Sequence, residues 1–254
     1  MVHDLCQWVM TNGLRIAAVF VLSGVVMPTD SEPEPIVTAI ANMALDTENT
    51  LTPAVPDGQV IWHMPRHTRH VALTFDDGPD DVVTPQLIAI LETYNVKATF
   101  FLVGHMMVKF PHIVDTIVAH GHDIANHTWA HYRLDEMTQH QVGHQVAHTM
   151  MMSQQLRYTM KPYVRPPGGR FNDYVLREAA AQGLTMVMWD VNAADYEHPI
   201  TGIPSAQAVA NRVIRRIKPG SIVLMHNGEA TVGALPVILD WLRSNQFSIG
   251  RIRW

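Results

Sequence analysis

The sequence has little of what several classes of protein require. Its only cysteine, Cys6, lies near the N-terminus, so the rest of the chain has no internal disulfide, which is compatible with export without arguing for it. The four lysines form no cluster and the formal net charge is -5, so no basic surface is available to attract nucleic acid. No apolar run reaches the roughly 20 residues of a membrane-spanning helix.

The composition is that of a folded protein with a surplus of one metal-binding residue type. Hydrophobic residues make up 47% of the 254 residues and charged residues 16%, which excludes a disordered chain. This length allows one large α/β domain or two small ones. The 15 histidines favour a metal site without locating it.

The N-terminal part of the chain has the features of targeting and linker sequence. An apolar run over residues 16–27 follows Arg15, which predicts that residues 1–27 are a signal peptide or an N-terminal membrane anchor. A buried first helix is the alternative, and cleavage near residues 39–41 is as defensible as retention of an anchor. Residues 28–58 are rich in proline and acidic residues, which predicts a linker that leads into a catalytic domain over residues 59–254.

From His70 onward, short apolar stretches alternate with longer stretches of helical periodicity. We expect strands over residues 71–75, 98–103, 163–165, 185–189, 221–225 and 248–252. We expect helices over residues 84–94, 111–120, 138–160, 173–182, 205–217 and 232–245, with starts favoured by Pro111, Asn172 and Ser205. Repeated strand–helix units predict an α/β fold with a parallel sheet, either open or closed into a barrel.

Polar residues follow four of the expected strands. In either architecture, functional side chains lie at the carboxyl ends of the strands. We therefore expect four segments to share one face of the fold, namely Asp76-Asp77, residues 166–168, Asp190 and His226.

Two histidines four residues apart can chelate one metal ion. His127 and His131 share one face if the stretch between them is helical. They lack the glutamate of an HExxH zinc site, so a base and a third ligand must come from elsewhere. His140, His144 and His148 show the same spacing, and we interpret that second series as a solvated helix face.

Three further segments contain candidate catalytic residues, and each of them also has a purely structural explanation. Asp76 and Asp77 can diverge, one onto a cation and the other towards a bound water, or they can cap the following helix with Asp80. Arg165 supplies a fixed cation before a Pro-Gly turn whose backbone N–H groups can stabilise an oxyanion, although such turns are often only structural. His226 ends an apolar strand and is either functional or structural.

Together, these segments resemble a known family. TFDDGP, HTWAH, RPPGG, WDVNAADY and LMH occur here in the order and at the spacings of the five motifs of the polysaccharide deacetylases, the NodB-homology carbohydrate esterases. The resemblance covers roughly residues 60–254. It implies a distorted, incomplete (β/α)7 barrel with parallel strands, and a metal-dependent hydrolase that removes acetyl groups from sugars.

The resemblance also implies a role for each matching residue. Asp77, His127 and His131 would hold one divalent ion, usually zinc and sometimes cobalt or another metal. Asp76 would be the general base, with Arg165 keeping it ionised and oriented. His226 would protonate the leaving amine, held in position by Asp195. The backbone N–H of Gly168 would help to stabilise the oxyanion.

The sequence departs from the family pattern at three positions. Gly168 stands where the family usually has tyrosine, Asn192 replaces the usual first aspartate of the fourth motif, and Tyr196 replaces its usual tryptophan. These changes put substrate preference and rate in question more than the reaction. For the substrate groove, we expect Trp129, Tyr132 and Tyr196 to stack on sugar faces.

The leading functional hypothesis is de-N-acetylation of N-acetylglucosamine residues in peptidoglycan by an enzyme that is secreted or anchored facing outwards. The alternatives are a chitin or chito-oligosaccharide deacetylase, an acetylxylan esterase, and a non-catalytic glycan-binding relative. We expect a monomer with an N-acetylated glycan as its partner, contact with a membrane only through the N-terminus, and no nucleic-acid ligand.

Overall fold

The computed structural model describes residues 58–196 and 202–253. The predicted export segment and nearly all of the predicted linker lie outside the described residues. Within them, no helix is both long enough and apolar enough to cross a membrane.

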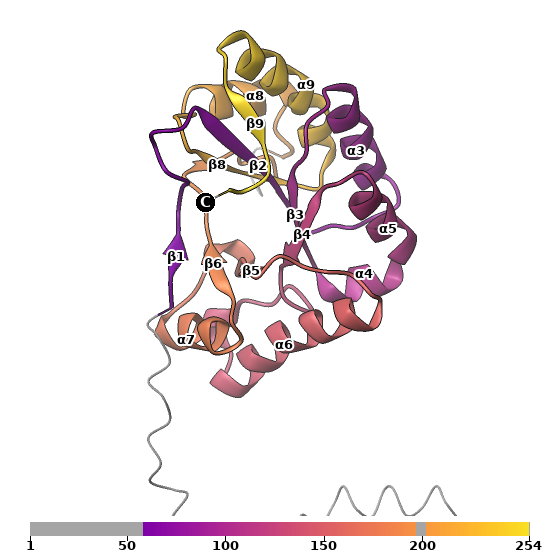
Figure 1. Cartoon of the computed structure of the whole chain (residues 1–254), viewed down its shortest axis with the longest axis vertical. Coiled ribbons are helices and arrows are strands. Elements are labelled where there is room, and N and C mark those ends of the chain that lie inside the picture. The colour runs from indigo at the N-terminus through magenta and orange to yellow at the C-terminus, as the bar shows by residue number, and fades with distance from the viewer. Residues whose placement is uncertain (1–57, 197–201, 254) are drawn as a thin grey trace, which may run out of the picture. The chain divides into compact units, whose positions relative to one another are not determined.

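A curled sheet of parallel strands forms the centre of the described domain (Figure 1). The strands run in the order β1-β6-β5-β4-β3-β2-β8-β7, and β9 pairs with β2. Their bounds are β1 (Val60–Ile61), β2 (His70–Asp76), β3 (Thr99–Leu102), β4 (Asp123–Asn126), β5 (Tyr163–Val164), β6 (Thr185–Val187), β7 (Val191–Asn192), β8 (Ile222–His226) and β9 (Ser248–Gly250). The strand pairings in the described residues are parallel, so the predicted α/β fold with a distorted, incomplete barrel is confirmed.

One segment bridges the two ends of the curled sheet. β6 pairs with β5, and only three residues later β7 pairs with β8 on the far side. The strands β6 and β7 are therefore two parts of one extended stretch that changes neighbours along its length. This switch brings residues that follow β5 close to residues at the end of β8.

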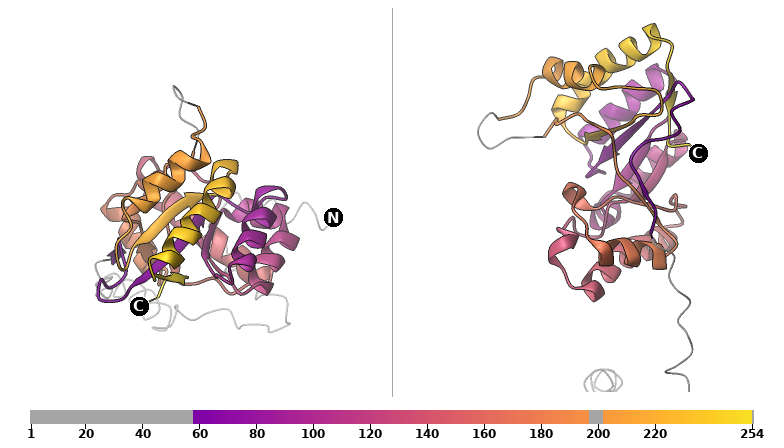
Figure 2. Two further views of the ribbon diagram at one scale, coloured as in Figure 1. Left: turned by 90° about the horizontal axis from the view of Figure 1, so that it is seen from above. Right: turned by 90° about the vertical axis from the view of Figure 1, so that its left-hand side faces the viewer.

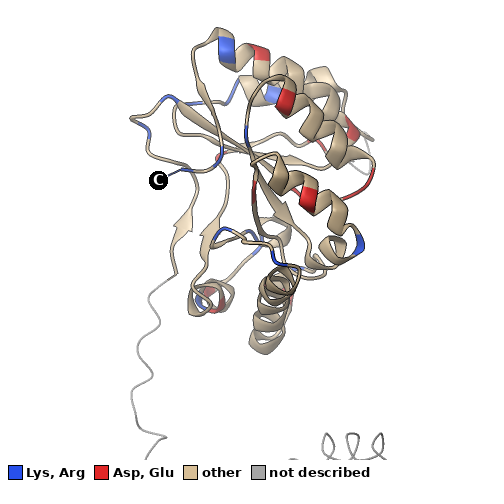
Figure 3. Cartoon of the chain, turned by 45° about the vertical axis from the view of Figure 1, so that its right-hand side comes forward, with Lys and Arg blue, Asp and Glu red and all other residues tan. Residues whose placement is uncertain are grey.

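Helices cover the outside of the sheet (Figure 2). They are α3 (Val83–Thr93), α4 (Gly104–Lys109), α5 (Pro111–Ala119), α6 (Gln139–Gln155), α7 (Asp173–Ala181), α8 (Ala206–Ile214) and α9 (Glu229–Ser244). Two short 3-10 turns lie at Leu134–Glu136 and Pro167–Gly169. Lysines, arginines and carboxylates mark most helices, whereas α6 carries none of them (Figure 3).

The alternation of side chains along β2 separates the two sides of the sheet. Val71, Leu73 and Phe75 pack in the large core beneath α3, α5 and α9. The alternate residues of the same strand, Thr74 and Asp76, point the opposite way, into the barrel, because successive side chains of a strand face opposite sides. Every residue of β2 is buried, so the carboxylate of Asp76, the last residue of the strand, lies inside the barrel at the edge of the apolar core.

The predicted helix starts are confirmed. Pro111 is the first residue of α5, the Asn172 side chain accepts a hydrogen bond from the Val175 N–H, and Ser205 accepts one from Ala208. Asp80 accepts from the N–H groups of Val82 and Val83 and so caps the first turn of α3.

The elements β4, β7 and α4 lie where no strand or helix was expected, and one expected helix was too long. The sequence of β4, DIAN, places polar residues at both ends and so lacks the apolar run of a buried strand, and β7 has only two residues. α4 has only six residues, too few to show a helical period. The helix expected over residues 138–160 ends at Gln155, because Arg157 has the positive φ of 64° that breaks a helix.

Candidate metal-dependent active site

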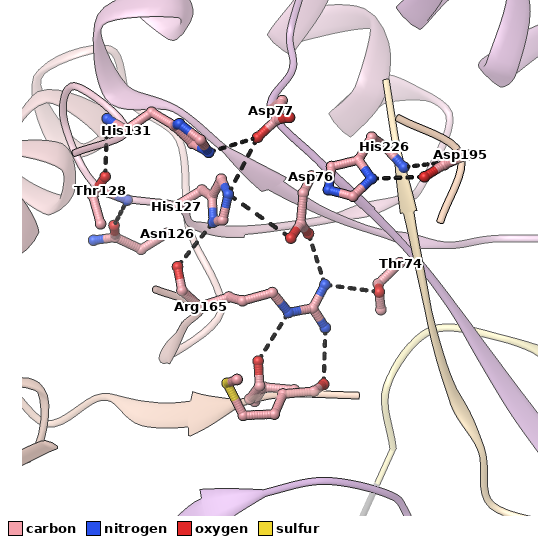
Figure 4. Close-up of polar contacts among 12 residues, drawn as sticks. Thr74, Asp76, Asp77, Asn126, His127, Thr128, His131, Arg165, Asp195 and His226 are labelled. Atoms are coloured by element: carbon pink, nitrogen blue, oxygen red, sulfur yellow. Dashed lines mark hydrogen bonds and ion pairs between the residues drawn. The ribbon is translucent and has the colours of Figure 1, made fainter. Parts of the chain in front are cut away.

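Two adjacent carboxylates diverge at the carboxyl end of β2. Asp76 is the last residue of the strand, and its side chain is 4% exposed. Asp77 has φ 77°, a left-handed conformation that turns the chain out of the strand, and its side chain is half-exposed. The two carboxylates therefore serve different neighbours, since Asp76 contacts Arg165 and Asp77 contacts two imidazoles (Figure 4).

Asp77, His127 and His131 form a compact set of potential metal ligands. Oδ1 of Asp77 lies 3.0 Å from Nε2 of His131 and 3.3 Å from Nε2 of His127. Ligand atoms of all three residues lie within 4.8 Å of one another. Nδ1 of His127 donates to the backbone carbonyl of Arg165 at 2.8 Å, which leaves the Nε2 lone pair facing the shared centre. One carboxylate and two imidazoles suit a divalent ion of the zinc type that keeps open positions.

The electrostatics of Asp77 agree with this donor set. Burial opposes its ionisation, but the polar contacts with the imidazoles of His127 and His131 outweigh burial and hold the pKa of the carboxyl well below its usual range. Asp77 is therefore ionised at neutral pH and can bind a cation without first losing a proton.

The segment that carries both imidazoles is a tight, non-helical loop, so the condition of a shared helix face is not met. Thr128 and His131 both have positive φ values, of 70° and 58°. Such conformations cost on the order of 1–3 kcal/mol each unless neighbours enforce them. The neighbours here are side chains: Asn126 accepts from the Thr128 N–H, Thr128 Oγ1 accepts from the His131 N–H, and Gln145 accepts from the Ala130 N–H.

Trp129 faces away from the cavity in which the ligands gather. Its ring stacks on His148 with centroids 3.9 Å apart, and a Cβ placed on Gly104 would lie 2.5 Å from its ring. The structure therefore places Trp129 between α4 and α6, where it anchors the loop, instead of at a sugar-binding surface. The interpretation of the second histidine series is correspondingly wrong for His148, whereas His140 and His144 are exposed.

Arg165 is fully buried and forms an ion pair with Asp76 inside the barrel. Its Nη1 donates to Asp76 Oδ1 at 2.7 Å and to Thr74 Oγ1 at 2.9 Å. The remaining donors bind the carbonyls of Val187 and Met188 at the end of β6. The guanidinium also lies over the Phe101 ring, 4.0 Å from its centroid. Asp76 therefore has one oxygen fixed by Arg165, while its other oxygen lies 3.8 Å from His127 Nε2.

His226 and Asp195 form a second pair across the site. His226 ends β8, and its Nδ1 donates to Asp195 Oδ1 at 2.7 Å. Burial opposes protonation of this imidazole, but the Asp195 hydrogen bond and the negative charges of Asp195, Asp76 and Asp77 outweigh it and raise the pKa of His226 to about 9. The ring is therefore a cation at neutral pH and can donate a proton from Nε2.

These groups meet at a cavity of about 240 Å³. Gly168, with φ 62°, forms one wall, and a Cβ there would meet nothing within 4 Å. Tyr196 lies edge-on to His226 with centroids 5.4 Å apart, whereas Tyr132 is 58% exposed and does not line the cavity. The lining residues are Asp76, His127, His131, Gly168, Trp189, Asn192, Tyr196, Leu224 and His226.

Asp190 does not join the other strand-end residues, so that expectation is wrong. Its carboxylate accepts from the N–H of Ile222 at the start of β8, and from Arg66 and Ser221. The extended stretch from β6 to β7 turns Asp190 towards the opposite end of the barrel from His226. Its role is to tie together segments remote in sequence.

Comparison with known proteins places these residues in a family. The polysaccharide deacetylase model matches residues 63–187. A peptidoglycan-N-acetylglucosamine deacetylase of Bacillus cereus is 32% identical over 199 residues, which cover 76% of this chain and 90% of the relative. The chain belongs to the polysaccharide deacetylase family.

Solved structures agree with this assignment. The Bc1960 peptidoglycan N-acetylglucosamine deacetylase aligns with a TM-score of 0.73 at 32% identity, covering 80% of this chain and 95% of that one. A CE4 family pseudoenzyme from Bacillus anthracis aligns with a TM-score of 0.70 at 27% identity, covering 80% and 68% of the two chains. A pseudoenzyme therefore has a similar fold, so the fold alone does not establish activity. The evidence for activity must come from the residues of the site.

Three residues of this polysaccharide deacetylase site were not singled out from the sequence. Thr74 binds Arg165, and Leu224 and Trp189 line the cavity. Thr74 and Leu224 each lie two residues before a named site residue on the same strand, so the period of two would have placed them on the same face. Trp189 follows β6, and no periodic signal distinguishes it from a core residue.

Proposed function

We propose that this polysaccharide deacetylase removes N-acetyl groups from N-acetylglucosamine residues of peptidoglycan. The observation that carries the proposal is the placement of two separate proton-transfer groups, Asp76 and His226, on one cavity beside the ligand set of Asp77, His127 and His131. The substrate class is supported by the Bacillus cereus relative, which is named a peptidoglycan-N-acetylglucosamine deacetylase.

The ligand set would hold one divalent ion, and we propose Zn²⁺ because a carboxylate and two imidazoles match its preferences. When bound, such an ion polarises the acetyl carbonyl and makes a water molecule more acidic. Co²⁺ has similar preferences, so metal analysis of the protein purified without added metal decides between them.

The chain's own residues then divide the proton transfers. Asp76, fixed through one oxygen by Arg165, accepts the proton of the attacking water with its other oxygen. His226 donates a proton to the sugar nitrogen as the C–N bond breaks, and Asp195 stabilises the imidazolium. The products are acetate and a free amine, so atoms and protons balance. The backbone N–H of Gly168 is the proposed donor to the developing oxyanion.

Export belongs to the same proposal, because peptidoglycan lies outside the cytoplasm. The apolar run over residues 16–27 and the acidic linker support a secreted enzyme or one anchored at the outer face of the cell membrane.

The test is acetate release by the metal-loaded protein from three substrates: peptidoglycan, an N-acetylglucosamine pentamer and acetylated xylan. We expect release from the first two, with mass spectrometry showing the loss of acetyl groups from N-acetylglucosamine. Asp77→Ala should lose both metal and activity. Release only from acetylated xylan would make the protein an esterase. Measurable glycan binding with unchanged glycan mass would make it a non-catalytic relative.

A further inference from the structure

The carboxylate of Asp195 has a third hydrogen-bond donor that the proposed mechanism does not use. Oδ1 accepts from the His226 ring, whereas Oδ2 accepts from the His226 backbone N–H at 2.7 Å and from the Thr231 hydroxyl. Thr231 belongs to the first turn of α9, behind β8, and is completely buried. A side chain on a helix outside the cavity thus contacts the partner of the proton donor directly.

Thr231 fixes a degree of freedom that the other contacts leave open. The Asp195 side chain is 0% exposed, so water does not replace a missing donor. Without Thr231, only the backbone N–H of His226 would bind Oδ2, and a carboxylate with one donor on each oxygen can still rotate about its Cβ–Cγ bond. A third donor from a different element, α9, restricts that rotation. Oδ1 is then held in the plane where the Nδ1–H of His226 reaches it.

The surroundings of Thr231 support a role beyond filling space. Its backbone N–H is already bound to the carbonyl of Gly228, so the hydroxyl is not needed to cap α9. A valine at this position would fill the same space, because it has almost the same shape as threonine, but it would lack the hydroxyl that donates the hydrogen bond. The hydroxyl is therefore the part of Thr231 that the site requires.

We propose that Thr231 is a positioning residue for proton donation: its hydroxyl orients Asp195, which in turn holds the His226 ring towards the cavity. This inference rests on the proposed function of His226 and adds a residue outside the five motifs. The titratable groups that face His226 are Asp195, Asp76, Asp77 and His131. Of these four, Thr231 contacts Asp195, so it acts on the proton donor and leaves the ligand set unchanged.

The test compares Thr231→Val with Thr231→Ser in the full, metal-loaded chain. We expect Thr231→Val to lower kcat on the N-acetylglucosamine pentamer on the order of tenfold, with KM nearly unchanged, because the loss of a hydrogen bond to a charged group is of this size. The alkaline limb of its pH profile should move to lower pH. Thr231→Ser should recover most of kcat, because it keeps the hydroxyl.

A double-variant experiment separates positioning from packing. In an Asp195→Ala background, Thr231→Val should cause no further loss of kcat, because its only route to the reaction has been removed. Thr99→Val is the matched control, since Thr99 is also buried but its hydroxyl accepts from Ile252, away from this pair. We expect the control to leave kcat and the pH profile near those of the wild type.

The failure of this inference is distinguishable from the failure of the proposed function. If the wild type releases no acetate from any N-acetylglucosamine substrate, the imidazole resonances of His226 still report its pKa by NMR, and Thr231→Val should lower that pKa. An unchanged His226 pKa would overturn the inference. So would a Thr231→Ser variant as defective as Thr231→Val, an equal loss in the Asp195→Ala background, or a loss of bound metal.

Discussion

Asp76 and His226 are directly paired in register on the neighbouring parallel strands β2 and β8. Each is the last residue of its strand, and each faces the barrel interior with its own oppositely charged partner. Arg165 contacts Asp76, and Asp195 contacts His226. Two ionisable groups with separate partners can hold opposite protonation states side by side, which a base and an acid in one reaction require.

Replacing Asp76 with asparagine should remove the base without removing the metal. The amide keeps the shape of the side chain but accepts no proton, so kcat should fall by about 10²–10⁴-fold. Acetate release and metal content measured on the same sample check this. Asp80→Asn is the control, because Asp80 caps α3 and is expected to affect stability alone. Unaltered kcat in Asp76→Asn would remove Asp76 from the mechanism.

Replacing Arg165 with methionine should destabilise the fold as well as the reaction. The change leaves a buried carboxylate and two backbone carbonyls without their donor, since Arg165 contacts Asp76, Val187 and Met188 from a fully buried position. Breaking a buried ion pair from one side costs about 3–5 kcal/mol in the free energy of unfolding. Denaturant unfolding measures this cost. Arg177→Met, at an exposed position on α7, should change the free energy of unfolding by less than about 0.5 kcal/mol.

Metal removal should loosen the histidine loop. Asp77, Thr128 and His131 all have positive φ values, and a bound ion would offset part of that strain by linking the loop to β2. With the ion at 100 times its dissociation constant, binding stabilises the native state by about 2.7 kcal/mol. A chelator should therefore lower the Tm and speed amide exchange over residues 127–131, and Zn²⁺ should reverse both effects.

The matched control for metal removal is the Asp77→Ala variant. This variant lacks one of the three ligands, so the same chelator should barely change its Tm. An equal fall in Tm for both proteins would show that the chelator acts elsewhere, and would count against the site.

The strand ends were predictable because the period of two and the apolar runs mark where a buried strand stops. The direction in which a residue leaves its strand was not. Asp190 follows an apolar run just as Asp76 ends one, yet the neighbour switch between β6 and β7 turns Asp190 to the other end of the barrel. Only the pairing of remote strands decides that outcome.

The loop that carries the two imidazoles shows a second limit of sequence reasoning. The spacing of His127 and His131 is equally compatible with a helix and with the observed loop. The loop depends on side-chain oxygens of Asn126 and Gln145 that accept hydrogen bonds from its backbone N–H groups, and Gln145 lies on a helix that follows later in the chain. Local spacing contains no information about such partners. The same holds for Trp129, which an aromatic-rich motif suggests as a sugar platform but which stacks on His148.

The pH dependence of the reaction should respond to Asp195 in a predictable direction. The pKa of His226 is raised to about 9, so its protonated form persists at neutral pH and is lost as the pH rises through that value. Activity that needs the imidazolium must therefore fall on the alkaline side. Asp195→Asn removes the negative charge that faces the ring, so the pKa of His226 should fall and the alkaline limb should move to lower pH by at least about one unit.

A control for Asp195 lies five residues away in the same motif. Asp190→Asn removes a carboxylate that binds Arg66 and Ser221 at the other end of the barrel, so its alkaline limb should match that of the wild type. The measurement is kcat/KM for the N-acetylglucosamine pentamer across the pH range, at saturating metal. An equal shift of the alkaline limb in both variants would show that its position depends on the net charge of the protein and not on Asp195. An unshifted limb in Asp195→Asn would assign proton donation to a group other than His226.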